Sequence, residues 1–175
     1  GIDGNVCIWD GKSNKKLHAP PCGGPVSALV FAPDGSTLAA AANDHPIRCG
    51  DAASGVEKPP IDVGEDTAEC LAFAPDGNRL VYCGKRKVIR LHNLAENRPD
   101  GEFPGLSVRV RQLAFSPDGV NLLAVGDDKA LRIWHLSSRQ PIGQPLVCKG
   151  TIQNITHSPN APVVAVAAKG SALRI

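Results

Sequence analysis

The sequence predicts an all-β protein built from copies of one structural unit, and three regularities support this prediction. The phrase Phe-Ser-Pro-Asp-Gly begins at residue 115, and related phrases begin at residues 31, 73 and 157, so the spacing is 42 residues each time. An arginine between apolar residues recurs at the same spacing, at positions 48, 90, 132 and 174. No segment places its apolar residues at helical spacing. A constant period of this length is typical of a repeat architecture, in which one supersecondary unit is copied and stacked.

The first two strands are predicted within residues 1–24. Residues 5–9 form a short run that ends near Trp9-Asp10, and residues 15–21 fit an outermost strand that ends at two prolines. The chain starts just before the first of these strands, stops at Ile175 inside another, and contains no methionine. We therefore expect it to be an excerpt of a longer polypeptide.

Each complete copy is predicted to begin with a strand and a tight turn. Residues 26–31 alternate so that Leu29 and Phe31 share one face, which is typical of a half-exposed strand. The pattern recurs in the next two copies, in Leu71 with Phe73 and in Leu113 with Phe115. In the following Pro-Asp-Gly, proline presets φ at the first central position, aspartate tolerates the second, and glycine completes the turn.

The other three strands of a copy differ in their expected exposure. The second is a nearly continuous run of mainly small apolar residues, which predicts a strand covered on both faces. It falls at residues 38–42, 80–83, 122–125 and 163–168. The third contains the recurring arginine, which we expect to be structural and to pair with neighbouring copies. The fourth is rich in proline, which lacks a ladder donor and therefore suits an edge strand.

Three features together resemble the WD-repeat (WD40) family of β-propellers. They are Trp9-Asp10 at a strand end, the run Leu131-Arg132-Ile133-Trp134, and the Pro-Asp-Gly phrase at its 42-residue period. The resemblance implies an all-β partial propeller of about four four-stranded blades, an excerpt of a larger seven- or eight-bladed ring. As one propeller segment, the chain then divides into the end of one blade (1–24), full blades at 25–66, 67–108 and 109–150, and an incomplete blade at 151–175.

The residues that brace each blade in this family are only partly present. The resemblance implies structural roles for two tryptophans that end third strands and two aspartates in the turns before them, namely Trp9, Trp134, Asp44 and Asp128. The remaining copies carry Gly50 and His92 at the tryptophan position, and Arg86 and Gly170 at the aspartate position. A half-made buried polar network is unfavourable, so we expect apolar packing to replace it, with His92 in a packing role.

The sequence predicts no catalytic, metal or cofactor site. It contains no glycine-rich phosphate loop, nucleophile elbow or His-Glu-x-x-His motif. The six cysteines include no Cys-x-x-Cys pair, and most lie in apolar runs, as expected for reduced, buried thiols of a cytoplasmic protein. His45 and Cys49 would lie about 13 Å apart along a strand, too far to share one metal ion. We therefore expect a protein that is not an enzyme.

Composition narrows the classes of partner. A net charge of +2 over 175 residues is too close to balance to favour nucleic acid or an anionic membrane surface. No run reaches the roughly twenty apolar residues of a membrane span. A protein or peptide partner is the class that remains, with self-association through open blade edges as an alternative.

The resemblance also indicates where a partner would bind. In the WD-repeat family, partners commonly dock on the face that carries the turns before the first and third strands of each blade. We call the matching residues of this sequence the candidate face: Glu69, Lys85, Arg109, Arg111, Asp127, Gln153 and Lys169. The sequence thus predicts a non-catalytic scaffold for a protein or peptide. Two alternatives stay open: a regulatory or sensor propeller attached to an enzyme such as a kinase or nucleotide switch elsewhere in a longer polypeptide, and a structural assembly subunit.

Overall fold

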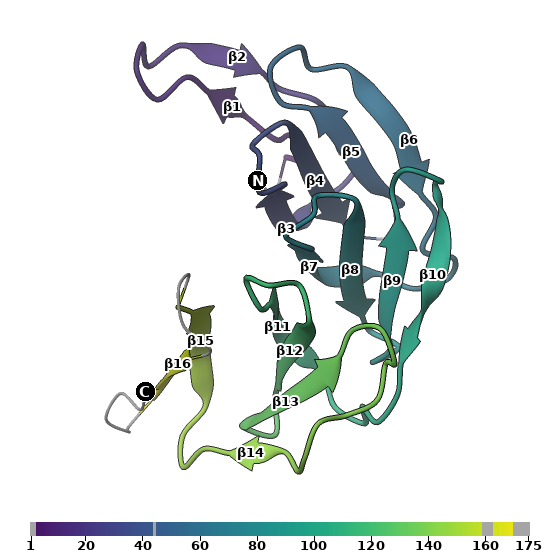
Figure 1. Ribbon diagram of the computed structural model, residues 1–175. Coiled ribbons are helices and arrows are strands. Elements are labelled where there is room, and N and C mark those ends of the chain that lie inside the picture. Colours follow the sequence, from purple (N-terminus) through teal and green to yellow (C-terminus); the bar gives the residue numbers. More distant parts are fainter. Residues whose placement is uncertain (1–2, 44, 159–162, 170–175) are drawn as a thin grey trace.

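In the part of the chain that the structure describes, five antiparallel sheets follow one another along an open arc (Figure 1). The computed structural model describes residues 3–43, 45–158 and 163–169. These ranges contain strands and no helix, which confirms the predicted all-β class. The first strands of the sheets lie on the concave side of the arc and the fourth strands on its convex side, so the sheets are arranged as the blades of a partial propeller.

A two-stranded hairpin lies at each end of the arc. The N-terminal hairpin pairs β1 (Ile8–Trp9) with β2 (Lys16–His18). The C-terminal hairpin pairs β15 (Ile152–His157) with β16 (Val164–Ala168). The strand predicted around Arg174, and the aspartate predicted to brace the first full blade, Asp44, lie outside the described residues.

Three four-stranded blades lie between the hairpins, and in each of them consecutive strands pair. Blade 1 consists of β3 (Val26–Phe31), β4 (Thr37–Ala42), β5 (Ile47–Asp51) and β6 (Glu57–Ile61). Blade 2 consists of β7 (Ala68–Phe73), β8 (Arg79–Gly84), β9 (Ile89–Asn93) and β10 (Arg98–Phe103). Blade 3 consists of β11 (Val110–Phe115), β12 (Asn121–Gly126), β13 (Ala130–His135) and β14 (Leu146–Val147). The predicted apolar runs therefore lie in the second strands, and the arginines at 48, 90 and 132 lie in the third.

The Pro-Asp-Gly phrase forms the turn between the first and second strands, as predicted. The glycines Gly35, Gly77 and Gly119 have φ values of 72°, 70° and 70°, a region that favours glycine. The preceding aspartate closes the turn from the side, since Oδ1 of Asp34 accepts the backbone N–H of Ser36 at 2.9 Å. Local chemistry alone thus specifies this element.

Apolar layers between facing sheets hold the blades together. The layer between blades 1 and 2 includes Ala39, Ala41, Phe73, Leu80 and Tyr82. The layer between blades 2 and 3 includes Val81, Phe103, Leu113, Leu122 and Trp134. Because β4 carries alanines, blade 1 leaves room for the larger aromatic side chains that blade 2 presents to it.

The exposure of the first strands departs from the prediction. Leu29 and Phe31 of β3 are 50% and 49% exposed, but the equivalent Phe73 and Phe115 are only 7% and 9% exposed. The preceding blade covers β7 and β11, whereas the N-terminal hairpin packs on Leu38 and Ala40 of β4 and leaves this face of β3 uncovered. The face shared by leucine and phenylalanine is therefore exposed in β3, whereas Phe73 of β7 and Leu113 and Phe115 of β11 are buried.

Candidate partner-binding face

The residues of the candidate face lie at one edge of three successive sheets. Glu69, Arg111 and Gln153 are each the second residue of a first strand, in β7, β11 and β15. The register pairs the start of each first strand with the end of the second strand, for example Val110 with Gly126. Lys85, Asp127 and Lys169, which directly follow the second strands, therefore lie at the same edge.

A β-bulge marks the same position in every copy. The ladder between first and second strands is interrupted between Val26 and Ala28, Ala68 and Cys70, Val110 and Gln112, and Ile152 and Asn154. The bulged residues are Ser27, Glu69, Arg111 and Gln153. A bulge leaves one residue unpaired and redirects its side chain, and bulges are frequent beside binding sites. The fold thus presents a different side chain from an equivalent place on each sheet.

Two ion pairs organise part of the candidate face. Nε of Arg109 donates to Oε2 of Glu69 at 2.7 Å and links blade 3 to blade 2. Nε of Arg111 donates to Oδ1 of Asp127 within blade 3. The hydrogen bond with Glu69 also raises the pKa of Arg109. Such exposed pairs typically contribute only about 0–1 kcal/mol, so they position these side chains rather than stabilise the fold.

The other residues of the candidate face are open to solvent. Lys85, Gln153 and Lys169 are exposed, and the backbone N–H of Lys169 donates to the carbonyl oxygen of Thr151 at 2.9 Å. The equivalent backbone bond joins Asp127 to Arg109 at 3.0 Å. This bond fixes the turn after the second strand against the segment before the first strand. The face is therefore built on ordered backbone with exposed side chains.

Beneath the candidate face, blade 2 contains a buried acid that the sequence did not reveal. Oδ1 of Asp66 accepts the backbone N–H groups of Thr67 at 2.9 Å and Arg86 at 3.1 Å, and Oδ2 pairs with a terminal guanidinium nitrogen of Arg90 at 2.8 Å. Nε of Arg90 donates to Glu102 at 3.0 Å. Arg86 occupies the family aspartate position in the turn between β8 and β9, and Asp66 supplies a carboxylate from the segment that precedes β7. In the sequence, the one feature that could have indicated this acid is the presence of an aspartate two residues before a first strand.

The recurring arginines at 48, 90 and 132 each form an ion pair, but the prediction of a partner in a neighbouring blade is wrong for Arg48 and Arg132. Arg48 pairs with Glu57 of β6 at 2.8 Å, and Arg132 pairs with Asp128 at 2.6 Å. Both of these arginines bond within their own blade, and Arg90 pairs with Glu102 of its own blade and with Asp66 of the segment that joins blade 1 to blade 2. The reason is geometric, because the third strand lies beside the fourth strand and the preceding turn of its own sheet. The hydrogen bond from Arg132 lowers the pKa of Asp128, which fits the bracing role expected of that residue.

The two tryptophans have contrasting environments. Trp134 is buried, its Nε1 donates to the carbonyl oxygen of Pro104 at 2.9 Å, and its ring meets Phe103 edge-on with centroids 6.3 Å apart. Trp9 is 60% exposed, so it does not brace a blade within the described residues. His92 replaces tryptophan in blade 2, where it is buried and its Nε2 lies 3.1 Å from Oδ1 of Asn97. Burial lowers the pKa of His92.

The cysteines are free thiols, and four of them are buried: Cys22, Cys49, Cys70 and Cys83. Desolvation raises the pKa of Cys49 and Cys70 to about 11 and that of Cys83 to about 12. These thiols are therefore protonated at neutral pH and suited to packing. In the described parts of the chain, no group of three or more His, Cys, Asp or Glu side chains could hold a metal ion. Within the same ranges, no helix has the length and apolar character needed to span a bilayer.

Comparison with known families gives one match. A family model described as "WD domain, G-beta repeat" matches residues 11–45 and 98–135. The first range ends after β4, and the second extends from β10 through the end of β13. A search of curated proteins returned no match to the chain.

Proposed function

Because this chain belongs to the WD40 repeat family, whose repeats are generally protein-interaction scaffolds, we propose that it is a non-catalytic scaffold for a protein or peptide partner. The partner binds the candidate face, where turns from three successive sheets meet. The position of Arg109, Arg111, Lys85 and Lys169 gives this face a basic side. Asp127 and Glu69 give it acidic groups, so the partner contributes charges of both signs.

The repeated β-bulge is the observation that carries this proposal. The strands of a sheet can pair without a bulge, and each bulge removes hydrogen bonds between the two strands. A bulge at the same place in every sheet is therefore not needed for strand pairing. At Ser27 the side chain is used within the fold, since its Oγ donates to the Ala68 carbonyl oxygen at 2.7 Å. At Glu69, Arg111 and Gln153 the bulge presents longer polar side chains. A surface of this kind recognises a partner through directed polar contacts at few points.

Charge reversal at two arginines tests the proposed face. Arg109→Glu and Arg111→Glu place like charges beside Glu69 and Asp127, and we expect each to weaken partner binding about tenfold or more, because a rim charge is both lost and reversed. Arg98→Glu is the matched control, since Arg98 is also exposed and paired with a nearby acid, Glu96, but lies in β10. The measurement is affinity capture followed by titration of the purified partner. Equal affinity of all three variants and the parent chain would exclude the candidate face.

A second candidate role is structural assembly, and the uncovered face of β3 favours it. Leu29 and Phe31 there are about half exposed, while Phe73 and Phe115, the equivalents of Phe31 in blades 2 and 3, are buried against a preceding sheet. Covering them would remove apolar area from water at roughly 25 cal/mol per Å². A second copy of the chain, or further blades, would provide that cover, and sedimentation at several protein concentrations distinguishes an associating chain from a monomeric one.

A further inference from the structure

The fourth strand of blade 3 is interrupted. β6 has five residues and β10 has six, but β14 has only Leu146 and Val147. Beyond those residues the sheet contact resumes only at an isolated bridge between Trp134 and Pro141. Pro141 and Pro145 have no backbone N–H for the ladder, and Gly143 turns the chain with a φ of 67°. The backbone N–H of Ile142 still donates to the carbonyl oxygen of Ile133 at 2.8 Å, and residues 143–145 then bow away from β13.

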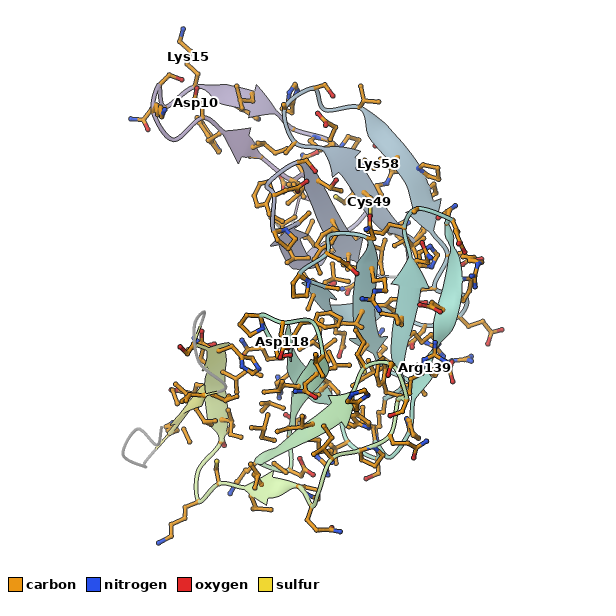
Figure 2. The ribbon with its side chains drawn as sticks, in the orientation of Figure 1. Asp10, Lys15, Cys49, Lys58, Asp118 and Arg139 are labelled. Atoms are coloured by element: carbon orange, nitrogen blue, oxygen red, sulfur yellow. The ribbon has the colours of Figure 1, made fainter. Side chains whose placement is uncertain are left out.

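A groove opens where this segment leaves the sheet. A hollow of about 220 Å³ lies between β13 and the bowed segment, with Ile133, Trp134 and Pro141 among its walls. A second hollow of about 420 Å³ runs beside β10 and is lined by Lys87, Phe103, Leu106 and Arg139. Both hollows include Pro104 and Gly105, so they adjoin, and we call them together the outer groove. Figure 2 shows Arg139 on the loop that follows β13, next to β10.

The size of the outer groove sets it apart from the corresponding seam at the start of the arc. The pocket between the N-terminal hairpin and blade 1 has a volume of only about 30 Å³, enough for one or two water molecules. The outer groove is comparable in volume to sites that bind ligands, which span roughly 300–1,000 Å³. It is thus large enough for side chains of a second molecule.

The floor of the outer groove is apolar and fixed. Phe103 and Trp134 are buried beneath it in edge-to-face contact, and the hydrogen bond from Trp134 holds the Pro104 carbonyl in place. Ile142, just before the bowed segment, is 46% exposed at the margin of the groove. A partner side chain placed here would therefore meet a preformed apolar surface with little cost of rearrangement.

The charges on the walls are mainly positive. Three cations and one acid line the groove, namely Lys87, Arg132, Arg139 and Glu102. Glu102 is neutralised by Arg90, while Arg132 and Arg139 pair with Asp128 and Asp100. Lys87 forms no ion pair within the described part of the chain, and it is held at a φ of 60° in the turn between β8 and β9. One cation at the rim is therefore available to a ligand.

We propose that the outer groove binds an extended peptide segment of a partner protein in which acidic and apolar residues alternate. A carboxylate of the peptide pairs with Lys87, and an apolar side chain enters the hollow beside Ile133 and Pro141. This site lies between blades 2 and 3 toward the convex side of the arc, and it adjoins the candidate face, since Lys87 lies in the same turn between β8 and β9 as Lys85. It goes beyond the proposed function and does not depend on it.

Synthetic peptides test the proposal on the full chain. Two short fluorescein-labelled peptides, one with an Asp-Leu-Asp-Leu core and one with an Asn-Leu-Asn-Leu core, are titrated by fluorescence anisotropy at low ionic strength. We expect the aspartate peptide to bind more tightly, and Lys87→Glu to weaken its binding about fivefold or more through loss and reversal of one charge. Lys129→Glu is the matched control, because Lys129 has the equivalent position in blade 3 and a φ of 63° but does not line the groove.

A second pair of variants tests the apolar part of the site. Ile142→Asp should lower the affinity for the aspartate peptide, whereas Val56→Asp, at an exposed valine before β6, should leave it unchanged. Arg109→Glu should also leave it unchanged, which separates this site from the candidate face. Equal binding of both peptides, or equal losses in Lys87→Glu and Lys129→Glu, would overturn the proposal. So would tighter binding of a labelled single-stranded oligonucleotide that is lost in Lys87→Glu, since that outcome identifies a nucleic-acid site instead.

Discussion

At the scale of single residues, similar sequence positions have different physical roles because their surroundings differ. Trp134 is buried against Phe103 and bonded to Pro104, whereas Trp9 is exposed. Asp128 pairs with Arg132 of its own blade, while in blade 2 the equivalent Arg90 pairs with Asp66, which lies in the segment before β7. The repeat therefore keeps the carboxylate–arginine contact and changes the residue that supplies the acid.

Removing the charge of Asp66 should destabilise the chain. Asp66→Asn keeps an acceptor for the backbone N–H groups but leaves Arg90 with only Glu102, and we expect a loss of about 2–3 kcal/mol in the free energy of unfolding. That is somewhat below the roughly 3–5 kcal/mol of a fully buried pair, because Arg90 is partly exposed. Urea unfolding followed by circular dichroism measures the loss. Glu65→Gln, which removes the exposed partner of Arg86, is the control and should cost about 0–1 kcal/mol; equal losses would contradict a special role for Asp66.

At the scale of elements, the close approach between the end of the second strand and the start of the first strand depends on residue size. Ala42, Gly84, Gly126 and Ala168 occupy this place in successive sheets. In blade 2 the approach is tightest, since a Cβ on Gly84 would lie 1.8 Å from the Thr67 carbonyl oxygen and 2.7 Å from Oδ1 of Asp66. The glycine thus leaves room for the Thr67 carbonyl group and for the buried carboxylate of Asp66.

Adding one methyl group at Gly84 should disturb this arrangement. Gly84→Ala forces the backbone at Thr67 to move, and we expect it to lower the free energy of unfolding by about 1–3 kcal/mol, the usual range for overpacking. At Gly126 the nearest atom to an added Cβ is a side-chain methyl of Val108, at 2.6 Å, which can move more easily than backbone. Gly126→Ala should therefore cost less, as thermal or urea unfolding of the two variants would reveal. The reverse order would refute the assignment of Gly84 as the tighter contact.

At the scale of the whole molecule, each blade depends on its neighbour for part of its core. Phe73 of blade 2 and Phe115 of blade 3, which begin the repeated Pro-Asp-Gly phrase, are buried against the preceding blade. Blade 1 leaves Leu29 and Phe31 uncovered. Repeat proteins of this kind normally need capped ends for solubility, since an end repeat otherwise exposes apolar surface. Cover of the β3 face by another sheet would therefore bury two large apolar side chains.

Association through the β3 face is tested by substitution. If the chain self-associates there, its average mass should rise with concentration in sedimentation velocity, and Leu29→Glu and Phe31→Glu should each return it to the monomer by placing a charge at the interface. Val56→Glu adds the same charge at another exposed apolar residue and should leave association intact. A mass that is monomeric at every concentration, or that is the same for all variants, would count against assembly through this face.

The strands and turns could be predicted from the sequence because they depend on local chemistry. Pro-Asp-Gly specifies its turn through the φ preferences of proline and glycine, and continuous apolar runs specify covered strands. The candidate face could be placed only as a set of positions, at the starts of first strands and the ends of second strands. Its ion pairs could not be predicted, because Arg109 reaches Glu69 in another blade, 40 residues away in the chain.

The sequence by itself determined the period of 42 residues, the order of strands within a copy and the family to which the repeats belong, since all of these are encoded in short segments. Only the tertiary structure decided that Arg90 pairs with Asp66, that Phe73 is buried while Phe31 is exposed, and that the bowed segment after Pro141 opens a groove. The physical reason is that burial, ion pairing and cavity formation depend on which surface faces a residue. That surface belongs to another strand or another blade, and its position is fixed only when the sheets pack together.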